Sequence, residues 1–202
     1  MNSVMKTDPK RILVTLIGIY ILGTGVALIT IAGLGTGCLD ALDEVIANAT
    51  GLSFGRVTFF AQILMVIIAL IIYPKNIGIG TLMAMFLTQF PIDITYLFIK
   101  RPDNTTIGIL MACIATVVMA FGAALIIHGG LGMGTYEAMT FSFDYRFHWP
   151  FVYVKYAFDS VFLILALIFH GRIGIGTIIA YLFLGKLIEV FGKLFQKYIT
   201  FR

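Results

Sequence analysis

The sequence predicts an all-α membrane protein with six transmembrane helices arranged as two inverted three-helix repeats. Three observations predict it: an apolar composition, six apolar runs of spanning length, and two glycine motifs that occur twice in the same order. The 202 residues are 60% apolar and only 12% charged, with a mean hydropathy of +1.01. Soluble domains carry about 25% charged residues, and a chain of this size cannot bury so much apolar surface. The composition excludes a soluble enzyme, a disordered chain and a secreted disulfide scaffold.

Six apolar runs have the length of about 20 residues that crosses a bilayer core as a helix. They extend over residues 12–32, 56–73, 77–99, 107–128, 151–169 and 173–192. The first run is too long for the apolar part of a signal peptide and has no cleavage motif after it, so we expect it to be a retained span. No long linker interrupts the chain, which predicts a single transmembrane domain over residues 1–202.

Two glycine motifs repeat along the chain. The segment GLGTG at 33–37 returns at 130–134 as GLGMG, and IGIGT at 77–81 returns unchanged at 173–177. Two acidic positions align as well, Asp40 with Glu137 and Asp93 with Glu189. Ordered agreement of this kind predicts an internal repeat, with copies over about residues 8–100 and 104–198. Each copy holds three spans, and an odd number of spans places the two copies in the membrane in opposite orientations.

A short helix is expected after each GLGxG segment, over residues 38–48 and 135–146, too short to span. Half-length helices at matching positions of inverted halves indicate a substrate site, because free backbone amides at membrane depth must be buried or line a polar cavity. We therefore expect four glycines to line such a cavity: Gly35, Gly37, Gly132 and Gly134. The alternative is that these glycines only permit tight turns and close helix packing.

Ionisable side chains inside apolar spans usually face a cavity or a partner. Asp93 and Glu189 lie inside apolar runs, Gln89 lies one helical turn before Asp93, and Asp159 lies four residues after Lys155, which could neutralise it. Asp40 and Glu137 lie near the starts of the short helices, where a carboxylate either faces the site or caps free amides. The expected substrate-binding residues are Gly35, Gly37, Asp40, Gln89, Asp93, Gly132, Gly134, Glu137, Asp159 and Glu189.

The segment Gly33-Leu34-Gly35-Thr36-Gly37 with Asp40, followed by Ile77-Gly78-Ile79-Gly80-Thr81 with Asp93, resembles the YczE/YyaS/YitT group of small bacterial integral membrane proteins. The group's motif has a proline where this chain has Cys38, and in the second copy Thr135 stands there and Glu137 replaces the aspartate. The resemblance implies a multi-span protein of the bacterial inner membrane.

With six spans, both termini lie on the same side of the membrane. If that side is the cytoplasm, the cytoplasmic segments carry more basic residues than the outer segments. Inner segments then carry Lys6, Lys10, Arg11, Lys75, Arg146, Lys193, Lys197 and Arg202. Outer segments carry Arg56, Lys100, Arg101 and Arg172. The excess of inner positive charge predicts that the N- and C-termini are both cytoplasmic.

We predict a small-molecule or ion transporter, a secondary permease that couples to protons or binds a cation, with a midplane site at the repeat interface. The alternatives are a membrane-embedded substrate-binding or accessory subunit of a larger complex, and a channel with aquaporin-like half-helices. We expect no enzyme activity, because no nucleophile with a paired base and no metal constellation is visible. We also expect no metal and no other cofactor. The expected partners are the lipid bilayer and a small-molecule or ion substrate, and a homodimer is one assembly that the chain could form. We expect no nucleic-acid partner.

Overall fold

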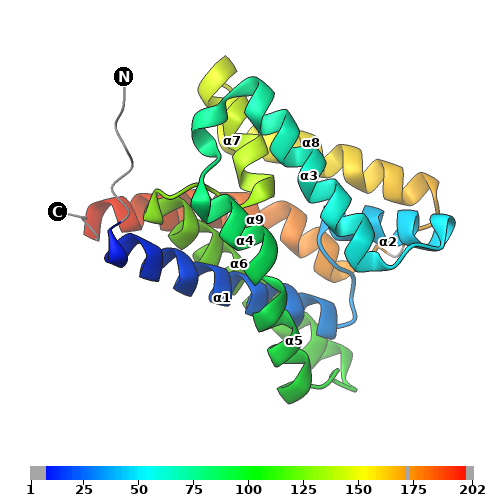
Figure 1. The fold of residues 1–202 in the computed structure, drawn as a ribbon. Helices are drawn as coiled ribbons and strands as arrows, with labels where there is room; N and C mark the ends of the chain where they lie inside the picture. Colours follow the sequence, from blue (N-terminus) through cyan, green and yellow to red (C-terminus); the bar gives the residue numbers. More distant parts are fainter. Residues whose placement is uncertain (1–7, 172, 199–202) are drawn as a thin grey trace.

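The computed structural model describes residues 8–171 and 173–198, and all regular structure within them is helical. Lys6, Arg172 and Arg202, which contribute to the charge count, lie outside the described residues. The helices are α1 (Pro9–Ile31), α2 (Cys38–Thr50), α3 (Phe54–Ile72), the 3₁₀ turn η1 (Pro74–Asn76), α4 (Ile79–Leu87), α5 (Gln89–Phe98), α6 (Thr105–Gly129), α7 (Thr135–Phe147), α8 (Phe151–Ile168) and α9 (Ile175–Tyr198) (Figure 1).

Six helical stretches are long and apolar enough to cross a membrane, as the sequence predicted. They are α1, α3, the α4–α5 pair over Ile79–Phe98, α6, α8 and α9. Their outer faces are apolar: Leu97 is 79% exposed and Phe98 82% exposed. Large apolar side chains in such numbers are stable on an outer surface when lipid covers them. The chain is therefore a multi-pass membrane protein in a lipid bilayer.

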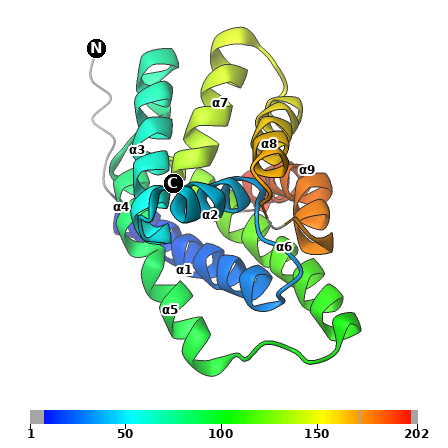
Figure 2. The ribbon, with the colours of Figure 1, turned by 90° about the vertical axis from the view of Figure 1, so that its right-hand side faces the viewer.

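Two helices, α2 and α7, have 13 residues each. A helix of this length extends about 20 Å, which is less than the roughly 30 Å of a bilayer core. Among the described helices, α2 packs mainly on α8, and α7 packs mainly on α3. Figure 2 shows α7 standing between α3 and α8. Each short helix is thus supported by a span from the other half of the chain.

The centre of the molecule is the contact between α1 and α6, which pack side by side with small residues between them. A side chain at Gly18 would meet the Ile126 backbone nitrogen at 2.9 Å, and one at Gly25 would meet that of Met119 at 2.8 Å. Residue numbers rise along α1 where they fall along α6, so the two helices are antiparallel. Small residues allow this close approach. The resulting van der Waals packing stabilises the contact in lipid, where the hydrophobic effect does not act between helices.

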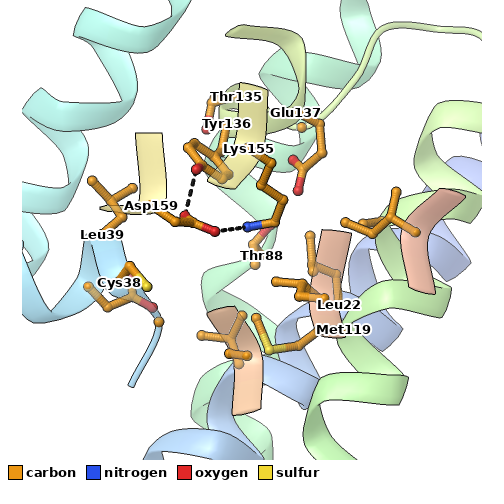
Figure 3. Close-up of a pocket in the computed structure, with 18 of the residues that line it drawn as sticks. Leu22, Cys38, Leu39, Thr88, Met119, Thr135, Tyr136, Glu137, Lys155 and Asp159 are labelled. Atoms are coloured by element: carbon orange, nitrogen blue, oxygen red, sulfur yellow. Dashed lines mark hydrogen bonds and ion pairs between the residues drawn. The ribbon is translucent and has the colours of Figure 1, made fainter. Parts of the chain in front are cut away.

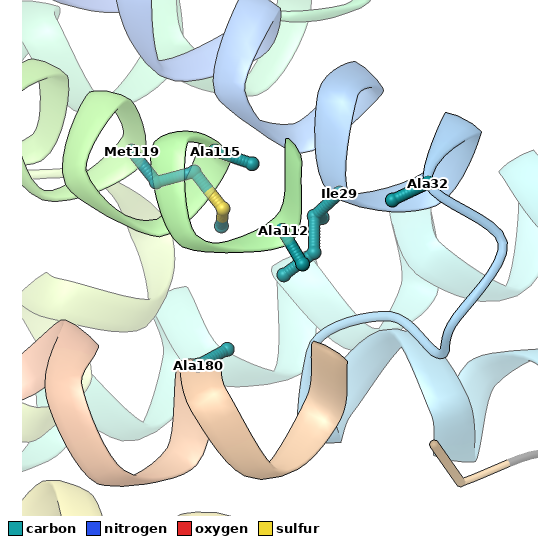
Figure 4. Close-up of a cluster of buried hydrophobic side chains, with 6 residues drawn as sticks. All are labelled: Ile29, Ala32, Ala112, Ala115, Met119 and Ala180. Atoms are coloured by element: carbon teal, nitrogen blue, oxygen red, sulfur yellow. The ribbon is translucent and has the colours of Figure 1, made fainter. Parts of the chain in front are cut away.

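A cluster of small apolar side chains extends this contact to α9. Its buried members are Ile29, Ala32, Ala112, Ala115, Met119 and Ala180 (Figure 4). The cluster joins three spans from both halves of the chain.

The third span is broken, which the sequence analysis did not predict. Pro91 has no N–H, so the helix loses the bond to the carbonyl four residues earlier. Accordingly α4 ends at Leu87 and α5 begins at Gln89, while the Thr88 hydroxyl donates to the Ala84 carbonyl at 2.6 Å. The bend lies against α1, where a side chain at Gly23 would come within 2.7 Å of the Thr88 carbonyl oxygen.

Candidate functional site

The two GLGxG segments dock onto the IGIGT segments of the opposite half of the chain. The Leu34 carbonyl oxygen accepts a hydrogen bond from the Gly176 N–H at 2.8 Å. The Leu131 carbonyl oxygen accepts the corresponding bond from the Gly80 N–H at 2.7 Å. The same junction therefore occurs twice with the halves exchanged. One junction holds the start of α2 against the start of α9, and the other holds the start of α7 against the start of α4.

Gly35 and Gly132 are required for these junctions. Their φ values are +101° and +117°, in the region that side chains of L residues rarely adopt. A Cβ at Gly35 would also overlap the Thr177 hydroxyl, and one at Gly132 would lie 2.6 Å from the Thr81 hydroxyl. The structure places these two glycines in the junctions and not along the cavity, whereas Gly37 and Gly134, the N-caps of α2 and α7, do line it.

A cavity of about 180 Å³ lies where the starts of α2 and α7 meet α1, α3, α4, α6, α8 and α9 (Figure 3). A space of this size can hold several waters or a small organic molecule. Much of its wall is apolar, with Leu22, Val26, Met85, Met119, Leu184 and Ile188. Its polar side chains are Asp40, Gln62, Thr88, Thr135, Tyr136, Glu137, Lys155, Asp159 and Tyr181.

A buried ion pair on α8 forms one side of the cavity. The Lys155 ammonium lies 2.6 Å from Asp159 Oδ2, and both residues are only 3% exposed. The Tyr136 hydroxyl donates to Asp159 Oδ1 at 2.6 Å, and the Lys155 ammonium lies 4.9 Å from the centre of the Tyr136 ring. Tyr136 is the second residue of α7, so the junction that fixes the start of α7 also positions this ring. Both oxygens of the Asp159 carboxylate thus have a donor.

Asp40 and Glu137 are each the third residue of a short helix, and each carboxylate folds back toward the glycine that precedes its helix. Both side chains also line the cavity, and Figure 3 shows the Glu137 carboxyl pointing into the same space as the Lys155 ammonium. Neither carboxylate has a basic partner within ion-pair distance in the described part of the chain. Burial raises the pKa of both carboxyls, while a backbone hydrogen bond opposes the rise at each.

Besides Gly35 and Gly132, three further expected site residues are not brought to the cavity: Gln89, Asp93 and Glu189. The buried residues of α5 are Pro91 and Thr95. Asp93 lies between them in the sequence and is on the opposite, exposed face of the helix. Gln89, in the first turn of α5, is also exposed. Glu189 lies on the exposed side of α9 and forms an ion pair with Lys193, four residues later. The apolar runs around these residues indicated buried surroundings, but the faces that carry them are directed outward.

Two members of the buried ion-pair cluster are absent from the predicted site residues. The sequence predicts Lys155 only as a neighbour that could neutralise Asp159, and it gives no prediction for Tyr136. The spacing of four between Lys155 and Asp159 is a signal for a helical ion pair, and its position inside an apolar run indicated a cavity. Tyr136 gave no local signal, because its contact with Asp159 depends on how α7 packs against α8.

Three carboxyls and one ammonium line this cavity in the described residues: Asp40, Glu137, Asp159 and Lys155. Lys155 balances one carboxyl, which leaves two to take up a proton or attract a cation. Backbone and phenol groups around them supply additional hydrogen bonds. The arrangement can therefore hold a proton or a positively charged solute against an apolar wall.

Comparison with known proteins places the chain in a family. Residues 9–193 match the model of a family of unknown function, DUF6198. YyaS of Bacillus subtilis is 29% identical over 192 residues, which cover 90% of this chain and 92% of YyaS. An uncharacterized protein of Haemophilus influenzae is 25% identical over 190 residues, covering 94% of this chain and 87% of that protein. No solved structure matches. The YyaS match confirms the resemblance to a YyaS-like family. Because the family model covers nearly all of this chain, the chain belongs to DUF6198.

Proposed function

We propose that this protein is a small-solute or ion transporter whose substrate site is the cavity between the starts of α2 and α7. The observation that carries the proposal is the doubled junction around that cavity, Leu34 with Gly176 and Leu131 with Gly80. Two half-length helices that begin at one polar cavity, each held by the opposite half of the chain, form the arrangement expected of a transporter site at a repeat interface.

The proposal includes an inverted repeat, with copies at about 8–100 and 104–198. The centre of the α1–α6 contact supports it. A side chain at Gly25 would meet Met119, and a side chain at Gly122 would meet Leu22. Gly25 and Gly122 are related by the same shift of 97 residues as Leu22 and Met119, so the two contacts exchange under that shift. Antiparallel helices with exchangeable contacts are expected around a two-fold axis in the membrane plane.

A repeated junction also provides two related conformations. If one junction opens while the other closes, the cavity becomes accessible from one side of the membrane and then from the other. An accessory subunit has no need for this exchange, which is why transport is favoured over docking to a larger complex. The proposal is transport without covalent chemistry, in a bacterial inner membrane with both termini in the cytoplasm.

Coupling is proposed to involve the carboxyls of Asp40 and Glu137. Neither has a basic partner among the described residues, and both face the cavity. Acidic side chains that face a cavity in a membrane protein are common in proton and cation pathways. We infer that a proton or the substrate cation balances at least one of them during turnover.

The test is uptake of labelled solutes by the purified chain alone in proteoliposomes, which also contain a pH-sensitive dye to detect proton coupling. Gradients of monovalent metal cations, alkylammonium ions, amino acids and small carboxylates are applied in turn. We expect a saturable signal for at least one solute, and its loss in the double variant Asp40→Asn/Glu137→Gln. Asp103→Asn, on an exposed loop outside the cavity, is the matched control and should keep the wild-type rate.

Two results would contradict the proposal. Flux that rises without saturation would identify a channel. Absence of flux for every solute, from protein that melts cooperatively, would favour the accessory subunit.

A further inference from the structure

We propose that the ligand of the cavity is a small organic ammonium ion, and that the Lys155 ammonium occupies its place in this structure. The inference depends on the cavity being the substrate site, as proposed above, and it names the substrate class. It follows from the groups around the lysine head, from the room made for the lysine stem, and from the charge balance of the cavity.

The groups around the Lys155 head are those that recognise an ammonium ion. A carboxylate oxygen lies at 2.6 Å and the face of an aromatic ring at 4.9 Å from the nitrogen. Carboxylates and aromatic faces are the usual partners of alkylammonium groups. Tyr136 serves twice, since its ring faces the cation while its hydroxyl holds the second oxygen of Asp159 at 2.6 Å. The pocket around the head is therefore already shaped for a positively charged amine.

The lysine stem reaches this pocket because α9 makes room for it. A side chain at Gly185 would come within 2.9 Å of Lys155 Cδ. The stem thus packs against α9 at Gly185, and the head lies at the wall of the cavity. Burying such a pair contributes little stability in itself, because the cost of removing both charges from water offsets their attraction. Stability alone does not explain why the pair is placed beside a cavity.

The charge balance of the cavity selects a cation over an anion. Asp40 and Glu137 add two carboxyls to Asp159, while Lys155 is the cation that faces them in the described structure. A carboxylate or phosphate solute would meet more acidic than basic groups. An entering ammonium ion can take the place of the Lys155 head at Asp159, because the two cations compete for the same carboxylate and the same ring.

The walls select an organic cation over a metal ion. Leu22, Met119 and Leu184 offer apolar surface to an alkyl group. No group of three or more histidine, cysteine or acidic side chains that could hold a metal ion occurs among the residues described. Hard metal cations such as Ca²⁺ take several oxygen ligands at once, whereas one carboxylate and one ring are sufficient for an ammonium ion.

The test is chemical rescue of Lys155→Ala by n-propylammonium, which replaces the three methylene groups and the nitrogen that the substitution removes. Thermal melting of the purified variant in detergent is measured at neutral pH. We expect the Tm to fall in the variant and to recover by at least half of the loss as n-propylammonium is added, with saturation. Propanol and propionate, which lack the positive charge, should have no such effect.

Two variants serve as matched controls. Lys155→Ala/Asp159→Asn lacks the carboxylate and should show no rescue. Lys193→Ala removes the lysine of an exposed pair with the same spacing of four residues, and its Tm should not respond to the amine. A Tm of Lys155→Ala that responds to n-propylammonium no more than the double variant does would overturn the proposal.

Folding of Lys155→Ala is itself informative. If the variant is obtained folded only when n-propylammonium is present from expression onward, the proposal is supported. If it fails with and without the amine while the double variant folds, the proposal is wrong. The outcome is distinct from that of the transport test: rescue without flux leaves the ammonium site standing and contradicts transport, and flux without rescue does the reverse.

Discussion

In the proposed repeat the spans α3 and α8 match each other, yet they present different chemistry to the cavity. Lys155 and Asp159 on α8 correspond, by the shift of 97 residues, to Thr58 and Gln62 on α3. The α8 residues form a buried ion pair, while Gln62 is the neutral residue that α3 contributes to the cavity lining. The glycine junctions therefore occur in both halves of the chain, whereas the buried ion pair of the cavity lies in one half.

This division has a physical reason. The junctions depend on backbone groups and on the absence of side chains, so both copies need the same glycines. A second buried ion pair would add another desolvation cost without adding a second ligand position. The backbone framework can therefore be symmetric while the proposed ligand site is not.

The largest expected effect on stability comes from removing the Lys155 charge of α8, which has no counterpart in α3. Lys155→Ala leaves the buried Asp159 carboxylate without its cation, which costs about 3–5 kcal/mol of stability. Thr58→Ala at the matching place should cost less, about 0.5–1.5 kcal/mol, since it removes a hydroxyl next to the Asp43 carboxyl and no cation. Thermal melting in detergent gives both values, and Lys193→Ala, in an exposed pair, should cost less than about 1 kcal/mol. Similar losses for Lys155→Ala and Thr58→Ala would remove the difference between the two spans.

The next largest effect tests whether the two glycine junctions contribute equally to stability. A methyl group at Gly78 would overlap the Leu131 carbonyl, and one at Gly174 would overlap the Leu34 carbonyl. Each carbonyl is fixed by its hydrogen bond, so Gly78→Ala and Gly174→Ala should each cost about 3 kcal/mol. Gly55→Ala and Gly192→Ala, where the space is open, are the controls for melting measurements. A large loss at only one junction would mean that the two are not equivalent in the folded protein.

A smaller effect tests the tyrosine that supports the ion pair. Tyr136→Phe removes the hydrogen bond to the Asp159 carboxylate and should cost about 1.5–3 kcal/mol, as bonds to charged groups do. Tyr156→Phe removes a bond to the neutral Leu182 carbonyl and should cost about 0.5–1.5 kcal/mol. Chemical denaturation or melting of both variants under identical conditions makes the comparison. Equal losses would show that Asp159 does not depend on Tyr136.

The smallest effect concerns the paired acids of the short helices. Burial raises the pKa of Asp40 and Glu137, so each contributes stability in acid that is lost as the pH rises above the ordinary range of carboxyl pKa values. Asp40→Asn and Glu137→Gln keep the neutral form, and each should melt slightly higher than the wild type at neutral pH. We expect less than about 1 kcal/mol, because helix N-terminal amides offset part of the burial.

The measurement is Tm against pH, with the difference between variant and wild type disappearing toward about pH 4. If either variant melts well below the wild type at neutral pH, its carboxylate acts as a charged helix cap, and the two short helices differ in that respect.

Much of the architecture followed from local patterns in the sequence. Apolar runs near 20 residues identified the six spans, because the bilayer thickness sets the length of a helix that crosses it. The GLGxG segments marked the starts of two short helices, because several glycines within five residues disfavour a helix and permit the positive φ values found at Gly33, Gly35, Gly130 and Gly132. Such features depend on composition and chain order, which do not change when the helices pack.

The candidate site was only partly predictable for the opposite reason. Gly37, Asp40, Gly134, Glu137 and Asp159 line the cavity as expected. Asp93 and Glu189 were expected there because both lie in apolar runs, but a run of apolar residues does not say which face of its helix is directed inward. The bend at Thr88 and the packing of α5 on α1 turn Asp93 outward.

Local sequence patterns are sufficient to predict six helices of membrane-spanning length and two short helices behind matching glycine segments. The docking of each glycine segment on the opposite half of the chain, and the contact of Tyr136 with Lys155 and Asp159, are visible in the folded protein alone. Span length and helix breaks are written in neighbouring residues, whereas a junction between Leu34 and Gly176 joins positions far apart in the chain. Such contacts depend on the relative rotation of packed helices, which no local pattern encodes.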